Sequence, residues 1–240
     1  MRFWSMCLVF GALSMPCAAK TQVQVMTEDF PPFSYQKQGQ YVGIATERVV
    51  EILTLANLDY DIHMYPWARA MHKATTEANT LIYPIYRTPD REPLYHWFCP
   101  IYPATPVFIF GLASDNLEIT SLEQLKSKVI GVTRKDNSHN YLLKKGFTDG
   151  LNLDVVGRPL DNVINLAAGR IDAIVQTEPS LTYRADIIGV PFSKFKILHE
   201  IHRKNKNEHC IALNINSEPR VIEALQSGFS LWQAQQTPAN

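Results

Sequence analysis

The sequence has no excess of charge of either sign. Its 240 residues include 23 basic and 23 acidic side chains, which are interspersed along the chain. No basic field exists that would attract nucleic acid or an anionic membrane surface, so we expect neither as a partner. Low-complexity tracts, which form disordered interaction tails, are also missing. What remains is the composition of an ordinary globular chain, 46% hydrophobic, long enough for one large domain or two small ones.

Motifs for catalysis and cofactor binding are equally scarce. The sequence contains no P-loop, no GxGxxG string, no Ser-His-Asp order and no Cys/His set with metal-ligand spacing, and its 7 histidines are dispersed. We therefore expect a protein that uses no metal or other cofactor and is not an enzyme.

Long hydrophobic runs are missing as well. The first 19 residues, MRFWSMCLVFGALSMPCAA, carry an apolar run that is too short for a bilayer, which needs about 20 apolar residues. Arg2 precedes the run, and Cys17 and Ala19 put small side chains at the positions that a signal peptidase reads for a cut after Ala19. The pattern predicts a signal peptide over residues 1–19 and export of the mature chain. Lipidation of Cys17 is an alternative that Pro16, directly before it, disfavours.

Cysteine is rare, with 4 in the sequence, and Cys7 and Cys17 would leave with the signal peptide. The mature chain keeps Cys99 and Cys210. An even pair in an oxidising compartment suggests one disulfide. Two separately buried thiols are the alternative, because free cysteine is among the most buried residue types. The spacing alone leaves both possibilities open.

Strand-like and helix-like segments alternate along the mature chain. Residues 21–28, TQVQVMTE, alternate in polarity as a strand does. Residues 44–58 place their apolar side chains on one face of a helix, with Thr46 as its N-cap. Strands that alternate with helices predict a mostly parallel sheet covered on both faces.

The alternation restarts in the second half of the chain. A helix is expected at SLEQLKS, where Ser121 and Gln124 have the spacing of a capping box. The chain therefore divides into two successive α/β units, near residues 20–101 and 107–205. The remainder from residue 210 is too small to be a domain, so we expect it to pack on one of the units.

Several strings resemble periplasmic solute-binding proteins of family 3, which serve ABC transporters for polar amino acids. In chain order they are EDFPPFSY, GQYVGIATERVVEIL, RTPDRE, SLEQLKSKVIGV, LAAGRIDAIV and HCIAL. The resemblance covers essentially the whole mature chain. It implies a type II periplasmic-binding fold, in which two α/β lobes are joined by two hinge strands and enclose a ligand cleft. The boundaries that it implies are 20–101 plus 210–240 for lobe 1, 107–205 for lobe 2, and 102–106 and 206–209 for the hinge strands.

The resemblance also implies a function and a compartment. We expect a monomeric periplasmic protein that captures a small polar, carboxylate-bearing ligand by hinge closure for an ABC permease of the inner membrane. A ligand-sensing input for a signalling partner is the alternative. A dehydratase-like enzyme, with Glu178 or His139 as acid or base, is less favoured. The resemblance places Cys99 and Cys210 beside the two hinge strands, which favours the disulfide.

Arg91 is the main candidate for ligand binding. In the family, an arginine at this point of a T-x-x-R stretch holds the ligand carboxylate, and a guanidinium fork matches a carboxylate in a bidentate manner. Thr88 stands three residues earlier in the same turn. The alternative for Arg91 is a surface pair with a neighbouring acid. We expect Arg87 to be solvated.

Other candidates in lobe 1 come from the same resemblance. Trp67 and Arg69, in the string YPWARA, would face the cleft, where an indole can stack on a ligand. Aromatic side chains after the double proline would form a wall or pack in the core, and one of two adjacent acids would point inward near a ligand amine. These residues are Phe33, Tyr35, Glu28 and Asp29.

In lobe 2, relatives use the loop 132–141 and a helix N-terminus to hold the carboxylate, since free N–H groups and the helix dipole favour an anion. Asn137 and Ser138 would occupy the capping positions, and Arg134 would add positive charge. Simple capping by Ser138 is the alternative.

The sequence departs from the family on the side of the pocket that holds the ligand ammonium. Relatives have an aspartate where this chain has Thr177, with Glu178 beside it. A glycine-containing segment of the relatives is replaced by Pro84 and the bulkier Tyr86. We therefore expect a ligand that has a carboxylate but is not held by the standard α-amino acid contacts.

Overall fold

The computed structural model describes residues 22–201 and 208–236. The predicted signal peptide lies outside these residues, as does part of the predicted second hinge segment. Within the described ranges, no helix is both long and apolar enough to cross a membrane.

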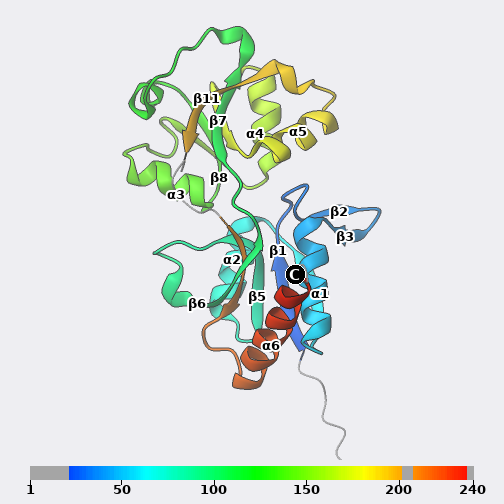
Figure 1. Ribbon diagram of the computed structural model, residues 1–240. Helices are drawn as coiled ribbons and strands as arrows, with labels where there is room; N and C mark the ends of the chain where they lie inside the picture. The colour runs from blue at the N-terminus through cyan, green and yellow to red at the C-terminus, as the bar shows by residue number, and fades with distance from the viewer. Residues whose placement is uncertain (1–21, 202–207, 237–240) are drawn as a thin grey trace, which may run out of the picture.

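The chain forms two lobes, each built on a five-stranded sheet (Figure 1). The sheet of lobe 1 has the order β4-β1-β5-β12-β6, and that of lobe 2 has the order β11-β7-β10-β8-β9. The strands of lobe 1 are β1 (Gln22–Thr27), β4 (Asp59–Met64), β5 (Thr80–Tyr86), β6 (Tyr95–Tyr102) and β12 (His209–Asn214). The strands of lobe 2 are β7 (Val107–Leu112), β8 (Ile130–Thr133), β9 (Leu153–Val156), β10 (Ala173–Gln176) and β11 (Phe195–Ile201). A small hairpin, β2 (Tyr35–Lys37) and β3 (Gln40–Val42), extends from lobe 1.

Each sheet is mostly parallel, as predicted, with one strand that runs against the other four. In lobe 1, β1 pairs in parallel with β4 and β5, while β12 runs antiparallel to β5 and β6. In lobe 2, β8 pairs in parallel with β9 and β10, while β7 runs antiparallel to β10 and β11. The antiparallel strands β7 and β12 are those that enter a sheet directly after the chain has crossed from the other lobe. The crossing therefore reverses the strand direction, which the local sequence pattern does not encode.

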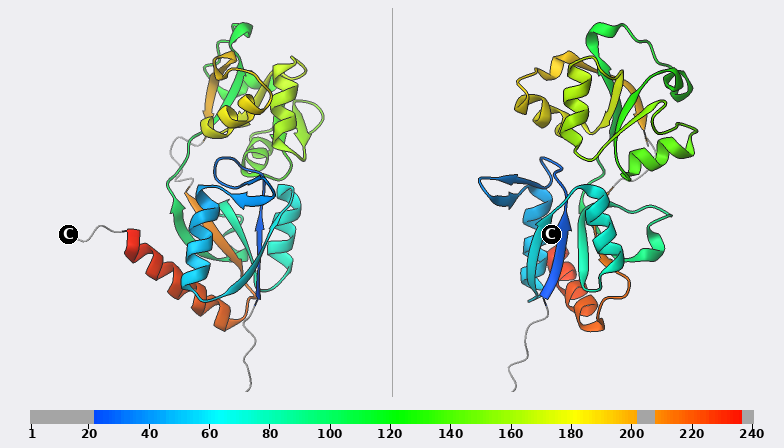
Figure 2. Two further views of the ribbon diagram at one scale, coloured as in Figure 1. Left: turned by 90° about the vertical axis from the view of Figure 1, so that its right-hand side faces the viewer. Right: turned by 180° about the vertical axis from the view of Figure 1, so that it is seen from behind.

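Helices cover both faces of each sheet. In lobe 1, the long C-terminal helix packs beside the first helix on one face, and α2 covers the other face (Figure 2). In lobe 2, α3 lies on one face and α4 and α5 lie on the other. The helices are α1 (Ile44–Leu55), α2 (Trp67–Thr76), α3 (Asn137–Lys144), α4 (Pro159–Ala167), α5 (Glu178–Ile187) and α6 (Pro219–Gln236).

The structure shows a different N-cap for α1 from the predicted one, and it contains the predicted capping box at Ser121. Helix α1 begins at Ile44 with Gly43 as its N-cap, so Thr46 lies inside the helix, where its hydroxyl donates to the Val42 carbonyl. Gly43 has a φ of 122°, which favours glycine, and a Cβ there would lie 2.5 Å from the Phe33 carbonyl oxygen. The capping box of Ser121 and Gln124 is confirmed, although it begins a 3-10 helix and not an α-helix.

The described residues also contain short 3-10 helices, which are η1 (Glu92–Leu94), η2 (Ala113–Asp115), η3 (Leu122–Ser127) and η4 (Phe192–Lys194). The most relevant of these is η1, because it leads from the predicted ligand-binding turn directly into β6. Strand β6 is an edge strand of the lobe 1 sheet, paired with β12, and it ends at Tyr102, where the first crossing to lobe 2 begins.

Candidate functional site

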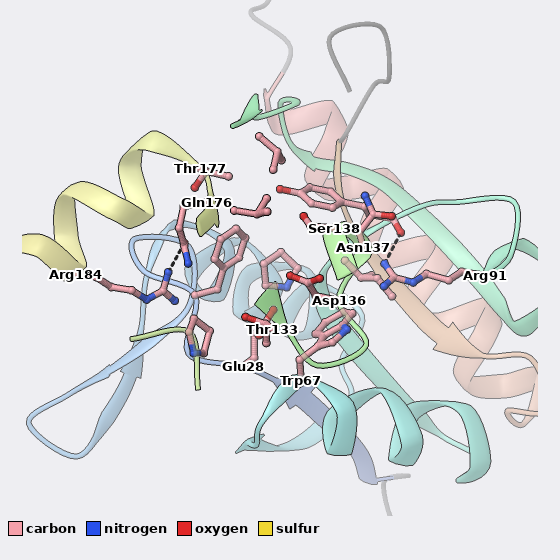
Figure 3. A pocket seen from close by; sticks show the side chains of 17 residues that line it. Glu28, Trp67, Arg91, Thr133, Asp136, Asn137, Ser138, Gln176, Thr177 and Arg184 are labelled. Carbon is pink, nitrogen blue, oxygen red and sulfur yellow. Dashed lines mark hydrogen bonds between the residues drawn. The ribbon is translucent and has the colours of Figure 1, made fainter. Parts of the chain in front are cut away.

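A cavity of about 80 Å³ lies between the lobes, at the carboxyl ends of the parallel strands. Figure 3 shows its lining side chains, which come from both lobes. In open α/β sheets, ligands bind outside the carboxyl ends of strands, where loops and helix N-termini meet. This volume exceeds the roughly 10–15 Å³ that one water needs, so the closed cavity has room for a small molecule.

Arg91 contributes a buried cation to the cavity. Its side chain is 6% exposed, and its guanidinium lies over the Trp67 ring, 5.1 Å from the ring centre. Nη1 donates to the Tyr86 carbonyl at 3.1 Å, and this is the one hydrogen bond of the Arg91 guanidinium to the described part of the chain. Burial lowers the pKa of Arg91 from its ordinary value. An arginine nevertheless stays charged at neutral pH, and its remaining N–H donors can bind an anion.

Trp67 joins the two lobes beside Arg91. Its Nε1 donates to the carbonyl of Lys135 in lobe 2 at 2.9 Å, and its side chain is 3% exposed. Lys135 has a φ of 61°, and its own N–H donates to Nδ1 of His139 at 3.0 Å. His139 contacts Asp149 through Nε2 at 2.8 Å. A chain of hydrogen bonds therefore fixes the carbonyl that receives the indole.

Two carboxylates face the same cavity, one from each lobe. Glu28 follows β1, and Asp136 precedes α3. Burial, followed by the charge of Asp136, raises the pKa of Glu28 to about 8. Burial raises the pKa of Asp136 to about 6, although the hydrogen bond from the His139 N–H at 2.6 Å opposes this increase.

The N-termini of two lobe 2 helices point at the cavity. Asn137 and Ser138 begin α3, and Thr177 caps α5, where its hydroxyl accepts from the Ser180 N–H at 3.4 Å. The cap of α3 is Asp136, so the prediction that Asn137 and Ser138 are the capping residues is wrong. Aspartate is a preferred N-cap because its carboxylate accepts from the free backbone N–H groups of the first turn.

Arg184 is a second buried arginine at the cavity, on α5. It is 1% exposed, and it donates to Oε1 of Gln176 at 2.8 Å and to the Asp29 carbonyl of lobe 1 at 2.7 Å. Burial lowers its pKa. Nε of Arg184 and the hydroxyl of Tyr86 are both buried without a partner among the residues that the structure describes. Both residues line the cavity.

The chain has structural relatives of known fold. The crystal structure of a histidine kinase sensor domain with similarity to periplasmic binding proteins matches with a TM-score of 0.76 and 18% sequence identity, over 90% of this chain and 92% of that one. An ancestral arginine-binding protein bound to arginine matches with a TM-score of 0.76 and 19% sequence identity. The match covers 90% of this chain and 94% of that protein. The arginine-, lysine-, histidine-binding protein ArtJ of Geobacillus stearothermophilus matches with a TM-score of 0.71 and 21% sequence identity. The match covers 90% of this chain and 93% of that protein.

The chain has the type II periplasmic-binding-protein fold. The structural relatives include amino-acid-binding proteins, and the two-lobed architecture that the sequence predicted is confirmed. No protein-family model matches the chain. The probable amino-acid-binding protein YxeM of Bacillus subtilis (strain 168) is 22% identical over 162 residues, which are 67% of this chain and 60% of that protein. The chain therefore matches less than two thirds of that relative's length.

Within this fold, about half of the predicted site residues lie at the cavity. They are Glu28, Trp67, Tyr86, Arg91, Asn137, Ser138 and Thr177. Of the two adjacent acids, Glu28 lines the cavity, while Asp29 is exposed. Arg87 is exposed, as predicted, and its guanidinium pairs with the carboxylate of Glu92.

The other predicted residues lie elsewhere in the structure. Phe33 is 2% exposed and packs on Tyr102 in the core, so Phe30 takes the predicted aromatic place at the cavity. Tyr35 packs against Tyr183 of lobe 2, with ring centres 5.1 Å apart and ring planes tilted by 57°. The remaining candidates are exposed or line other hollows. Thr88 lines the hollow on the outer side of Arg91, and Glu178 lines a hollow beside Thr105 and Pro106. Arg69 lies over the Tyr65 ring, and Arg134 lies near the Val155 carbonyl.

Sequence reasoning missed two charged residues at the cavity. Asp136 stands inside the loop that was expected to bind an anion, and an acid immediately before a helix is a readable N-cap signal. Arg184 had no such signal, because an arginine on an amphipathic helix is usually solvated. Its burial follows from contacts with Gln176 and Asp29, which come from two different lobes.

The predicted disulfide is confirmed. Cys99 on β6 and Cys210 on β12 are bonded, with an S–S distance of 2.07 Å and Cα atoms 4.6 Å apart. Beside it, at the base of the hinge, His209 is fully buried, and its Nε2 lies 2.8 Å from the Thr105 hydroxyl in the first crossing segment. Burial lowers the pKa of His209 to about 3. The rings of Phe33 and Tyr86 pack against its imidazole.

Proposed function

We propose that this chain is an exported solute-binding protein that captures a small carboxylate-bearing ligand, an amino acid or a related compound, between its lobes. Hinge closure would bury the ligand, and the closed complex would deliver it to an ABC importer in the inner membrane. Binding and not catalysis is the proposed activity. The two-lobed fold and its amino-acid-binding relatives support this proposal.

The observation that carries the proposal is the buried guanidinium of Arg91. It is held over Trp67, and only one of its hydrogen bonds is made within the described ranges. The N-terminus of α3 faces it from the other lobe. A carboxylate between the two would receive charged N–H donors from lobe 1 and the favourable end of a helix dipole from lobe 2.

A thermal-shift screen of a metabolite library tests this function. A ligand that binds only the folded chain raises its melting temperature, and the stabilisation grows with the logarithm of its concentration relative to Kd. We expect shifts from carboxylate-bearing compounds, and a smaller radius of gyration of the liganded protein by X-ray scattering. A library in which only compounds without an acid group stabilise the chain would contradict the proposal.

Ligand sensing is the second candidate, favoured by the likeness to a histidine kinase sensor domain. Both functions need the same cavity and the same closure. Genes for a permease and an ATPase beside the gene for this chain would support transport, whereas a sensor kinase gene would support signalling. For either function, we propose cleavage after about Ala19 and a monomer in the periplasm, which the mass of the exported protein and its size in solution would test.

A further inference from the structure

A short segment after β1 connects lobe 1 to a helix of lobe 2. We name residues 29–35 the arm; they lead into the hairpin of β2 and β3, on the same side of the molecule as α5 (Figure 1). We propose that the arm and the face of α5 that carries Ser180 and Arg184 form a latch, which holds the lobes together and sets ligand affinity without selecting the ligand. This inference rests on the proposed function, because it assigns the residues that control closure over the same cavity.

Two hydrogen bonds join the arm to α5. The Ser180 hydroxyl donates to the Pro31 carbonyl, and Nη2 of Arg184 donates to the Asp29 carbonyl at 2.7 Å. Because residues one turn apart share a face of a helix, Ser180 and Arg184 lie on the same side of α5. One face of a lobe 2 helix therefore binds two backbone carbonyls of lobe 1.

The arm is anchored within lobe 1. The carbonyls that α5 contacts alternate with those of Glu28 and Phe30, which accept from the arm itself. The Ser34 hydroxyl donates to the Glu28 carbonyl at 2.9 Å, and the N–H groups of Phe33 and Ser34 donate to the Phe30 carbonyl at 2.8 and 3.0 Å. Phe33 and Ser34 are also buried. The carbonyls that α5 contacts are therefore positioned by lobe 1 before the lobes meet.

The two donors on α5 are buried and held in position as well. Ser180 is 0% exposed, and Nη1 of Arg184 donates to Oε1 of Gln176 at 2.8 Å, which fixes the guanidinium beside β10. When the lobes open, both donors would bind water in place of the lobe 1 carbonyls. Such an exchange has a modest net effect for each hydrogen bond, so the latch biases the equilibrium between open and closed forms and does not lock it.

An aromatic contact extends the latch toward the surface. Tyr35, the last residue of the arm, packs against Tyr183, which precedes Arg184 on α5. Both rings are half-buried, and their centres are 5.1 Å apart. An aromatic pair of this geometry adds to the stability of the closed form beyond the area that it buries.

The latch lies away from the predicted carboxylate site. Arg184 and Arg91 are on opposite sides of the cavity (Figure 3). Phe30, within the arm, is among the described residues that line the cavity, whereas Ser180 is not one of them. Docking of the arm therefore places a wall of the cavity, although the Ser180 hydroxyl itself lies outside the lining. A change at Ser180 alters the closed fraction, which scales the apparent affinity of every ligand by the same factor.

The test uses Ser180→Ala, since Arg184 lines the cavity and could contact the ligand directly. Alanine is a good helix former, so α5 is retained. X-ray scattering of the ligand-free protein is expected to show a larger radius of gyration for Ser180→Ala than for the wild type. Calorimetric titration with L-alanine, L-glutamine and the hits of the metabolite screen should show about fivefold weaker binding of each compound that binds, as for the loss of one hydrogen bond.

Matched variants keep the result interpretable. The Thr182 hydroxyl is exposed and donates to the Glu178 carbonyl within α5 at 2.9 Å, so Thr182→Ala should change neither the radius of gyration nor the affinity. Tyr35→Ala removes the aromatic contact of the latch and should weaken binding by about threefold. The melting temperature of each ligand-free variant shows whether it has folded.

The outcomes separate this inference from the proposed function. A uniform loss of affinity in Ser180→Ala supports the latch, whereas wild-type affinity in this variant would overturn the latch and leave the proposed function standing. A loss for one compound only would assign Ser180 to a ligand contact, which also overturns the latch. If no compound binds, the proposed function fails and the scattering decides the latch, which equal radii of gyration for wild type and Ser180→Ala would overturn.

Discussion

The two lobes place an arginine after equivalent strands, but the two arginines have different partners. Arg91 follows β5, and Arg184 lies on the helix after β10; both of these strands are next to the central parallel strand of their sheets. Arg184 is held by Gln176 and by a carbonyl of the opposite lobe, whereas Arg91 is held by one carbonyl of its own turn. In the function that we propose, Arg91 of lobe 1 would present its cation to the ligand, whereas Arg184 of lobe 2 binds the carbonyl of Asp29 in the opposite lobe.

A second difference concerns covalent reinforcement. The disulfide joins β6 and β12, the two strands of lobe 1 that flank the crossings, and the described part of lobe 2 has no such bond. In the hinge motion that we propose, lobe 1 would be the lobe that the disulfide reinforces, and lobe 2 would move against it. The following predictions test this asymmetry, beginning with the largest expected effect.

Removal of the disulfide by Cys99→Ser with Cys210→Ser is expected to lower the free energy of unfolding by about 2–5 kcal/mol. The bond closes a loop with a sequence separation of 111, which restricts the unfolded chain strongly. Urea denaturation of the wild type and the double variant measures the difference. As a control, a reducing agent should destabilise the wild type and leave the stability of the double variant unchanged. If the wild type and the double variant unfold with equal free energy without a reducing agent, the disulfide does not reinforce lobe 1.

Protonation of His209 is expected to destabilise the hinge in acid. Its pKa is about 3 in the folded protein against 6.5 for the free side chain, so the unfolded chain binds the extra proton first. Stability is therefore present above pH 6.5 and is lost as the pH falls toward 3, by roughly 3 kcal/mol at about pH 4.

His209→Phe should show a smaller loss of stability between these pH values than the wild type. A fixed cost of about 1 kcal/mol is expected at neutral pH, because the Thr105 hydroxyl loses its partner. His72→Gln, at an exposed position of α2, is the control that should retain the full acid loss. Urea denaturation across this range provides the comparison, and identical pH slopes for His209→Phe and wild type would show that His209 is not the acid-sensitive group.

The indole of Trp67 is expected to contribute about 1 kcal/mol to closure, which corresponds to about a fivefold change in ligand affinity. Trp67→Phe keeps an aromatic ring under Arg91 but removes the hydrogen bond to the Lys135 carbonyl. Trp97→Phe is a matched control, because its Nε1 donates to the Glu92 carbonyl within lobe 1. Titration with the best ligand from the screen should show weaker binding for Trp67→Phe only; equal losses in both variants would remove the role of this contact in closure.

The sequence predicted the two-lobed fold well, because short segments carry the signal: strands and helices alternate along the chain, and the strings that resemble the family follow one another in the expected order. Strand β1, for example, lies within residues 21–28, where the alternation of polarity placed it. It did not predict the direction of β12, which depends on the crossing between lobes. At the cavity, residues at strand ends such as Glu28 were found, while Arg184 was not, because its burial depends on contacts made across the cleft.

The central claim is that Arg91 holds the ligand carboxylate, and its neighbour Arg87 provides the internal comparison. Arg91 is 6% exposed and lines the cavity, whereas Arg87 is exposed and pairs with Glu92. Truncating a buried charged partner costs about 2–5 kcal/mol, so Arg91→Ala should weaken a carboxylate ligand by at least about thirtyfold. Calorimetric titration of Arg91→Ala and Arg87→Ala measures this directly. Loss of binding in Arg91→Ala alone is the predicted result, and wild-type affinity in Arg91→Ala would contradict the account.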